Sequence, residues 1–276
     1  MRVPSTDDVT LELHDLGGDG PSLLIAHATG FCAGAYRPFA AALAVRFHVW
    51  ALDFRAHGDA TAPADGDMTW RGMADDVLAV AAAIGDGPLV GVGHSMGGAC
   101  LMAAELRAPR TFRSAYLFEP IIVPPAFDDV PGGNPMSAAA RRRRPSFPSR
   151  PDALARYAGR PPLGRFRADV LHAYVEHGFA DAEDGTITLK CTPEQEAAVF
   201  EAAGKPRIEA MVDVDTPVMV ACGARDGGPG PGAFAPAIAE ALPRGSLRRY
   251  GHLGHFGPFQ DPDTIADDVI AFALGS

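Results

Sequence analysis

Four short, uninterrupted apolar runs, separated by segments with helical spacing, constrain the fold of this chain more than any other feature. The runs are residues 23–26, 49–52, 89–92 and 115–118, and the helical segments between them are residues 36–45, 70–84 and 96–107. Runs this short and this apolar are typical of strands buried on both faces, as in a parallel sheet. The alternation predicts a doubly wound α/β fold with a mostly parallel sheet and a ligand site at the carboxyl ends of its strands.

The alternation stops after residue 118 and resumes at residue 217. The intervening stretch begins rich in proline and glycine and then shows helical spacing near residues 151–157, 165–177 and 193–203. The pattern then predicts strands at residues 217–222 and 247–250 and helices at 234–242 and 262–274, while the alternating residues 9–14 predict a half-exposed edge strand. We therefore predict a core domain, residues 1–120 and 216–276, interrupted by an inserted helical cap, residues 121–215.

Composition limits the classes of partner. Of the 276 residues, 47% are hydrophobic, yet no apolar stretch is long enough to span a membrane. A net charge of -10 disfavours binding to nucleic acid. The four cysteines, Cys32, Cys100, Cys191 and Cys222, show neither zinc-site nor disulfide-framework spacing, and no cofactor is expected. The acidic N-terminus lacks the features of a signal peptide and predicts a cytoplasmic protein; the sequence leaves monomer and homodimer both open.

Residues 93–97 read Gly-His-Ser-Met-Gly and lie between an apolar run and a helical segment. In that context, G-x-S-x-G predicts a sharp strand-to-helix turn that holds the Ser95 hydroxyl at the top of the sheet. The turn also places Ser95 at a helix N-terminus, where backbone N–H groups favour an oxyanion. Ser95 is therefore the candidate nucleophile; the alternative interpretation is a tight turn that only begins a helix.

A nucleophilic serine needs a base, which follows it along the chain in this type of fold. His252 and His255 both lie on the loop between the last predicted strand and the last predicted helix, and either one can reach Ser95 from there. Their H-x-x-H spacing also resembles a metal pair, but no third ligand cluster stands nearby. The sequence therefore predicts a general base and no metal.

Two carboxylates are candidates for the acid that orients the base. Asp226 follows the predicted strand at residues 217–222 in a glycine-rich loop. Glu119 ends the run at residues 115–118, at the same edge of the sheet, and is the alternative acid or a buried polar residue that bonds to the backbone.

With these motifs the chain resembles the α/β-hydrolase superfamily, specifically serine esterase-like members with a lid inserted after the sixth strand. The resemblance covers residues 9–119 and 216–274. In that family the acid commonly sits in a G-x-x-D loop, here residues 223–226, and the histidine in a G-H stretch that runs to P-D, here residues 254–263. The resemblance thus favours His255 over His252 and Asp226 over Glu119.

The family's oxyanion loop corresponds to residues 27–31, His-Ala-Thr-Gly-Phe. This position implies that the backbone N–H groups of Thr29 and Met96 form the oxyanion hole, although Ala28 replaces the usual glycine. A second family loop, D-x-R-G-H-G-x-S, corresponds to residues 53–60 and implies a structural role for Asp53 and His57.

The resemblance implies hydrolysis of a carboxylic ester, lactone or thioester of a small molecule through an acyl-enzyme, without a metal or organic cofactor. Related alternatives on this fold are carbon-carbon bond hydrolysis and cofactor-free perhydrolysis. An alternative of another class is a non-catalytic receptor for a small ligand.

Side chains next to these loops are candidates for the substrate pocket. Phe31, Tyr36 and Phe256 are expected to line an apolar acyl site, although loop packing explains each of them equally well. The run Arg141 to Arg144 either binds an anionic substrate or forms a solvated face.

Overall fold

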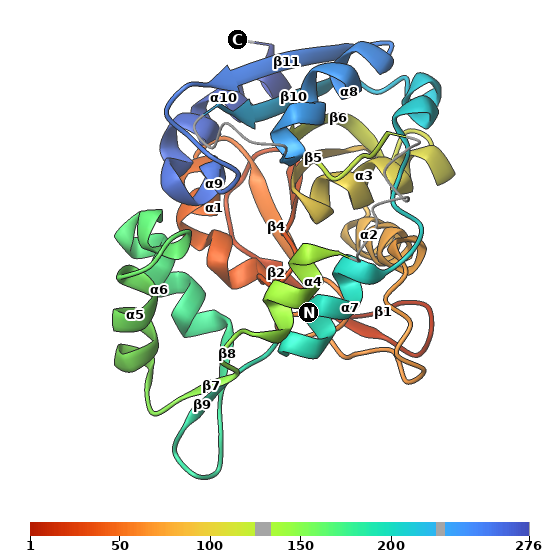
Figure 1. The fold of residues 1–276 in the computed structure, drawn as a ribbon. Helices are drawn as coiled ribbons and strands as arrows, with labels where there is room; N and C mark the ends of the chain where they lie inside the picture. The colour runs from red at the N-terminus through yellow and green to blue at the C-terminus, as the bar shows by residue number, and fades with distance from the viewer. Residues whose placement is uncertain (125–133, 225–229, 276) are drawn as a thin grey trace.

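The computed structural model describes residues 1–124, 134–224 and 230–275 (Figure 1). Its centre is an eight-stranded sheet in the order β1-β2-β4-β3-β5-β6-β10-β11. The strands are β1 (Arg2–Pro4), β2 (Thr10–Asp15), β3 (Ser22–Ala26), β4 (His48–Asp53), β5 (Leu89–His94), β6 (Phe112–Phe118), β10 (Val218–Gly223) and β11 (Gly245–Tyr250). From β4 to β11 in that order every neighbouring pair is parallel, whereas β1 and β2 run antiparallel to their neighbours.

The predicted α/β fold is confirmed, and each apolar run lies inside a parallel strand. All five residues of β3 and all six of β5 are buried, because helices cover both faces of the sheet. The alternating strand β2 is present, but it is not at the edge. The short β1 pairs with it at register Val3 to Leu11, a pairing that too few residues specify for the sequence to reveal it.

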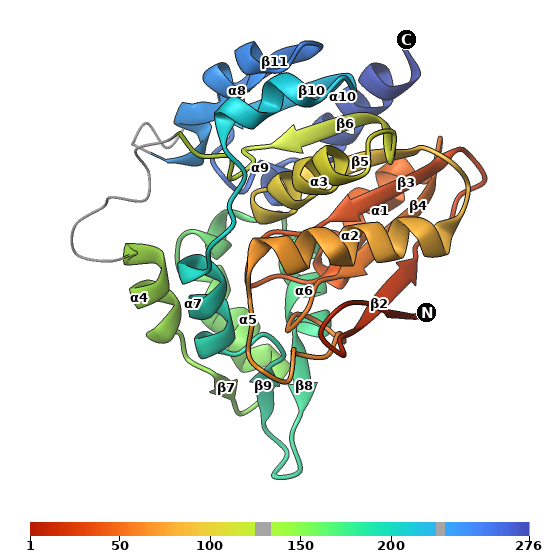
Figure 2. The ribbon, with the colours of Figure 1, turned by 90° about the vertical axis from the view of Figure 1, so that its right-hand side faces the viewer.

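Helices cover the two faces of the sheet in separate groups (Figure 2). On one face α1 (Arg37–Leu43) and α10 (Pro262–Leu274) pack against alternate strand residues such as Ile25 and Val49. On the other face α2 (Trp70–Ile84), α3 (Met96–Arg107) and α8 (Ala235–Ala241) pack against residues such as Leu24 and Leu117. Since side chains alternate across a strand, the two apolar sets form two separate cores.

The chain between β6 and β10 contributes no described strand to this sheet. We call residues 121–215 the inserted segment. Its helices are α4 (Pro135–Arg141), α5 (Arg150–Ala158), α6 (Ala168–His177) and α7 (Pro193–Glu201). It also contains a small antiparallel sheet of β7 (Ser146–Phe147), β8 (Phe179–Asp181) and β9 (Ile187–Leu189), which the expectation of a helical cap did not include. Strands of two or three residues are too short to show a periodic pattern.

The inserted segment packs over one end of the sheet (Figure 1). Arg167 N–H donates to Phe259 O at 2.9 Å, and Trp70 Nε1 donates to Val199 O at 3.0 Å. The core that contains α1 continues into this segment through Phe31, whose ring centroid lies 5.0 Å from that of Tyr174.

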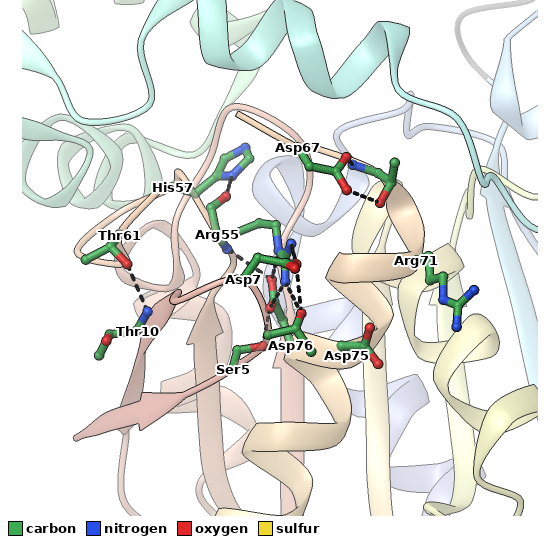
Figure 3. A network of polar contacts seen from close by, with 12 residues as sticks. Ser5, Asp7, Thr10, Arg55, His57, Thr61, Asp67, Arg71, Asp75 and Asp76 are labelled. Atoms are coloured by element: carbon green, nitrogen blue, oxygen red, sulfur yellow. Dashed lines mark hydrogen bonds and ion pairs between the residues drawn. The ribbon is translucent and has the colours of Figure 1, made fainter. Parts of the chain in front are cut away.

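Arg55, on the loop after β4, is the centre of a buried ion-pair network (Figure 3). Its guanidinium donates to both carboxylate oxygens of Asp76 on α2 at 2.9 Å and to Asp7 at 2.9 Å. Ser5 Oγ donates to Asp76 at 2.6 Å. The network ties the N-terminal segment, the loop after β4 and α2 together.

In the part of the chain that the structure describes, the longest apolar helices fall short of the length needed to cross a membrane.

Candidate active site

Ser95 lies at the sharp turn between β5 and α3, as the G-x-S-x-G pattern predicts. Its backbone is in the left-handed region, with φ 55° and ψ -115°, which an L-residue adopts only at a cost. The strain is held by backbone bonds from both sides: Ser95 N–H donates to Phe118 O at 2.9 Å, and Ile121 N–H donates to Ser95 O at 3.2 Å.

Glycine is required on both sides of the turn because the chain passes too close to its neighbours for a side chain. A Cβ at Gly93 would lie 2.4 Å from Gly98 Cα, and one at Gly97 would lie 2.1 Å from Ala26 O. The neighbours in both cases are backbone atoms, which cannot move away as the end of a side chain can. The two glycines therefore allow the sharp turn that presents Ser95.

Three side chains from distant parts of the sequence form a continuous contact. His255 Nε2 lies 3.2 Å from Ser95 Oγ, and His255 Nδ1 lies 2.7 Å from Glu119 Oε2. The second oxygen of Glu119, Oε1, accepts a bond from Gly223 N–H at 2.9 Å. Side-chain exposure rises from 5% for Glu119 to 24% for His255. The carboxylate is thus buried and the imidazole partly open.

The described contacts favour the alternative acid. Glu119 sits at the end of β6, where a φ of 45° turns its side chain into the site, whereas Asp226, the acid that the sequence analysis preferred, lies outside the described residues. Motif spacing compares the loop that carries Asp226 with the loop that carries Glu119 by sequence pattern alone, without the distance of either carboxylate from His255. Only the fold brings the Glu119 carboxylate against His255 Nδ1.

Of the two candidate histidines, the structure brings only His255 to Ser95. His252 is exposed, and its Nε2 pairs with Asp261 Oδ2 at 3.1 Å. The spacing along the loop turns His252 toward solvent while His255 points into the site.

Two backbone N–H groups of the loops around Ser95 were expected to form the oxyanion hole. Neither Thr29 N–H nor Met96 N–H donates to an acceptor within the described residues. Met96 is the first residue of α3, where the N–H groups have no partner inside the helix, and Thr29 lies on the loop after β3. Ala28, which replaces the usual glycine, has no positive φ; the left-handed residue of this loop is Gly30, with φ 78°.

His94, which sequence reasoning passed over, connects three loops of the site. Its Nε2 contacts His255 O at 2.8 Å, so this nitrogen carries the proton and Nδ1 accepts from Tyr36 OH at 2.7 Å. Tyr36 OH in turn accepts from Ala28 N–H at 3.1 Å. Burial lowers the pKa of His94 well below its usual value, which keeps the ring neutral and this arrangement intact.

The expected role of Tyr36 in the substrate pocket was wrong. This residue was expected to contact substrate, but it is 1% exposed and lies beneath the loops, where its hydroxyl joins Ala28 to His94. An aromatic residue near an active loop gives no sequence signal that separates these two roles.

A cavity of about 390 Å³ opens over Ser95. Phe31 and Phe256, two of the predicted pocket residues, line it together with Thr29 and His255. The opposite wall comes from the inserted segment and carries aromatic side chains and arginines. A cavity of this size accommodates a small organic molecule.

The loop after β4 plays a structural part. Asp53 accepts from Ala33 N–H at 2.7 Å and Asp59 N–H at 2.9 Å, and it contacts His14 Nε2 at 2.9 Å. Burial alone would raise the pKa of Asp53, but the bond to His14 and nearby histidine charge outweigh it, and the pKa is lowered. His57, a residue of this loop, is fully buried.

His14, Asp53 and Asp59 are also the one described group close enough together to hold a metal ion. Asp59 already pairs with Lys190 at 2.7 Å, and none of the three lines the cavity over Ser95.

The family model described as the alpha/beta hydrolase fold matches residues 21–262. The chain belongs to this α/β-hydrolase family. Human protein phosphatase methylesterase 1 is 38% identical over 95 residues, which are 33% of this chain and 25% of the methylesterase, so the match spans about a quarter of that relative. The 2-(acetamidomethylene)succinate hydrolase of Mesorhizobium japonicum is 27% identical over 220 residues, which are 78% of this chain and 74% of the relative.

Solved structures share the fold of this α/β hydrolase over nearly its whole length. A crystal structure of E-2-(acetamidomethylene)succinate hydrolase aligns with a TM-score of 0.81 at 22% identity, covering 99% of this chain and 98% of the other. An esterase from Thermogutta terrifontis aligns with a TM-score of 0.75 at 20% identity, covering 100% and 98%. At these identities the alignments show the shared architecture.

Proposed function

We propose that this α/β hydrolase cleaves a carboxylic ester, lactone or thioester of a small molecule through an acyl-enzyme on Ser95. The observation that carries the proposal is the contact from Ser95 Oγ through the His255 ring to Glu119, at the floor of a cavity that can hold substrate. A hydroxyl, an imidazole and a carboxylate in this order form an activated nucleophile.

In the first half of the reaction, His255 Nε2 accepts the proton of Ser95 Oγ as that oxygen attacks the carbonyl carbon. The negative charge that develops on the carbonyl oxygen is stabilised by the N–H groups of Thr29 and Met96, each contributing about 3 kcal/mol by comparison with similar sites. The protonated imidazole then donates its proton to the departing alcohol or thiol, and the acyl group stays on Ser95.

In the second half, water gives a proton to His255 Nε2 and attacks the acyl-enzyme. Collapse of this second tetrahedral intermediate returns the proton to Ser95 and releases the acid. The carboxylate of Glu119 accepts from His255 Nδ1–H throughout. This bond keeps the Nε2 lone pair directed at Ser95 and stabilises the imidazolium that forms at each step.

A fluorophosphonate probe tests the proposal directly. We expect covalent labelling at Ser95, found by peptide mass spectrometry, and no labelling of Ser95→Ala. Labelling must be accompanied by turnover of at least one member of a panel of p-nitrophenyl esters and lactones. If the protein is not labelled by the probe and hydrolyses no ester, it would be a receptor that binds a small ligand without catalysing a reaction.

The same panel separates the alternative reactions. Carbon-carbon bond hydrolysis would appear as cleavage of a diketone at a rate above that of every ester, and perhydrolysis as peracid formation in the presence of hydrogen peroxide. Similarity to a hydrolase named for 2-(acetamidomethylene)succinate supports a small-molecule substrate.

A further inference from the structure

The cavity over Ser95 has two chemically different walls. The wall from the sheet edge carries Ser95, Thr29 and His255. Among the residues that the structure describes, the wall from the inserted segment carries five arginines and one carboxylate, that of Glu196; the arginines are Arg142, Arg143, Arg144, Arg156 and Arg160. This excess of positive charge lies in a protein whose net charge is -10.

Within the described part of the chain, one of these arginines is neutralised by a carboxylate. Arg143 makes an ion pair with Glu196 and donates to Tyr174 OH at 2.6 Å. This pair lies against the oxyanion loop, because a Cβ at Gly30 would come within 2.6 Å of Glu196 Oε1 and 3.1 Å of Arg143 Nη1. Arg143 therefore helps to build the wall, and its charge is already matched.

The other four pair with no carboxylate in the described ranges 1–124, 134–224 and 230–275. Arg144 donates to Ser146 O at 2.8 Å and lies over the Phe147 ring, which leaves Arg142, Arg156 and Arg160 for a ligand. Arg142 follows α4, whereas Arg156 lies in the last turn of α5 and Arg160 just beyond it. Two separate elements thus direct unpaired guanidinium groups to one cavity.

Three arginines of the same segment that do not line the cavity are paired with carboxylates. Arg141 contacts Glu194 and Glu201, and Arg150 contacts Glu176 and Asp181. Arg167 contacts Asp169 and Asp263. The segment thus has carboxylates that neutralise these three arginines and Arg143, whereas Arg142, Arg156 and Arg160 have no carboxylate partner among the described residues.

We propose that Arg142, Arg156 and Arg160 bind an oxyanion, a carboxylate or a phosphate, at the end of the substrate remote from the scissile carbonyl. This inference rests on the proposed hydrolase function and names its substrate class: small anionic esters. Guanidinium groups match carboxylate and phosphate oxygens with paired hydrogen bonds. Apolar side chains that line the same cavity, Phe31, Phe147 and Phe256 among them, then contact the chain that joins the anion to the ester.

The test compares esters that share a six-carbon acyl chain and differ only at its far end. Mono-p-nitrophenyl adipate carries a carboxylate there, p-nitrophenyl hexanoate a methyl group, and two further esters carry a phosphate or a trimethylammonium group. We expect kcat/KM for the adipate to exceed that for the hexanoate by about tenfold or more, the size of one charged hydrogen bond. Added salt should reduce this ratio, since the arginines are exposed to solvent. The phosphate ester shows which oxyanion is preferred.

Variants assign the effect to the arginines. In the triple variant Arg142→Gln, Arg156→Gln, Arg160→Gln, the ratio should fall to about one, and each single variant should lower it in part. Because both esters are measured on the same protein, a loss of folded enzyme lowers both rates and leaves the ratio unchanged. Charge reversal in Arg156→Glu should shift the preference toward the trimethylammonium ester.

Arg46→Gln is the matched control, because Arg46 is an exposed arginine just before β4, at the opposite edge of the sheet from Ser95. It should keep the wild-type ratio. A wild-type ratio near one, with Ser95 still labelled by fluorophosphonate, overturns this inference and leaves the proposed function standing. A ratio that survives the triple variant overturns the assignment to these arginines. The absence of both labelling and turnover overturns the proposed function itself.

Discussion

Two networks of charged and polar side chains lie near the carboxyl ends of the strands, one around Arg55 and one around Ser95. They differ in whether their polar groups are accessible to a ligand. Around Arg55, the guanidinium and the Asp76 carboxylate are both fully buried and contact each other through two pairs of atoms. Around Ser95, the carboxylate of Glu119 is buried, but His255 is partly exposed and Ser95 faces a cavity. The two networks use the same kinds of group.

The comparison shows how environment separates stability from chemistry. A network whose donors and acceptors are all paired within the protein has nothing left to offer a ligand, and removing one member leaves a buried charge uncompensated. A network that ends on a hydroxyl beside unused N–H groups can act on a molecule that enters. We therefore expect substitutions in the Arg55 network to affect folding and substitutions in the Ser95 network to affect rate.

The largest effect is expected for Ser95→Ala. If Ser95 is the nucleophile that we propose, its removal should lower kcat by roughly 10⁵-fold or more, the size of effect known for serine hydrolases with this set of groups. Stability should not fall, because the hydroxyl contributes one long contact and the strained turn remains. Ester turnover and a thermal unfolding curve measure the two quantities, and a large drop in Tm would show that Ser95 belongs with the structural network.

The next largest effect distinguishes the two acids. Glu119→Gln should lower kcat by roughly 10³- to 10⁴-fold, since an amide cannot hold the imidazolium in the same way. Asp226→Asn should lower it less than tenfold. Both variants are compared by kcat/KM on one ester, and the reverse order would transfer the role of the acid to Asp226.

Stability is the expected readout of the Arg55 network. Asp76→Ala leaves the buried Arg55 guanidinium without its main partner and should lower the free energy of unfolding by about 3 to 5 kcal/mol. The rate per folded molecule should stay at the wild-type value. Urea unfolding combined with active-site titration measures both, and Asp75→Ala, which removes a partly exposed partner of Arg107, serves as the milder control.

A pH effect is expected where the two regions meet. His27 accepts from Phe54 N–H through Nε2 and contacts Ala28 O through Nδ1, so it links the loop after β4 to the oxyanion loop. Burial, aided by the charge of His57, lowers its pKa to about 3. Since the unfolded chain binds this proton near pH 6.5, stability is complete above that pH and decreases as pH falls toward 3.

Between pH 7 and pH 5, this histidine should account for about 2 kcal/mol of the lost free energy of unfolding. His27→Gln should remove that share of the pH dependence, whatever it does to stability at pH 7. Urea unfolding at the two pH values gives the difference directly, and an unchanged difference would contradict the buried, neutral state of His27.

The smallest effect is expected for His252→Ala. The side chain is 60% exposed and pairs with Asp261 at the surface, where such pairs contribute about 0 to 1 kcal/mol. Turnover should change less than twofold, whereas His255→Ala should abolish it. If His252→Ala and His255→Ala lost the same amount of turnover, the structure of the loop would be the requirement for turnover, and not the imidazole of His255.

The sequence alone was enough to predict the parallel strands of the sheet, most of the helices that cover it and the turn that carries Ser95. These features depend on local rules: buried strands need apolar runs, amphipathic helices need their spacing, and the turn needs glycines beside Ser95. The helices at Trp70–Ile84 and Met96–Arg107 accordingly begin and end at the predicted residues.

Tertiary structure decided the contacts between side chains, which these local rules do not predict. Whether Glu119 meets His255, whether Tyr36 faces substrate or backbone, and which arginines find a carboxylate all depend on contacts between residues far apart in the sequence. The residue types and their neighbours along the chain are the same whichever of the two roles a side chain takes, so the sequence cannot distinguish the roles. The chemistry of each side chain follows from the groups that the fold places within hydrogen-bonding distance and from how much water it leaves around them.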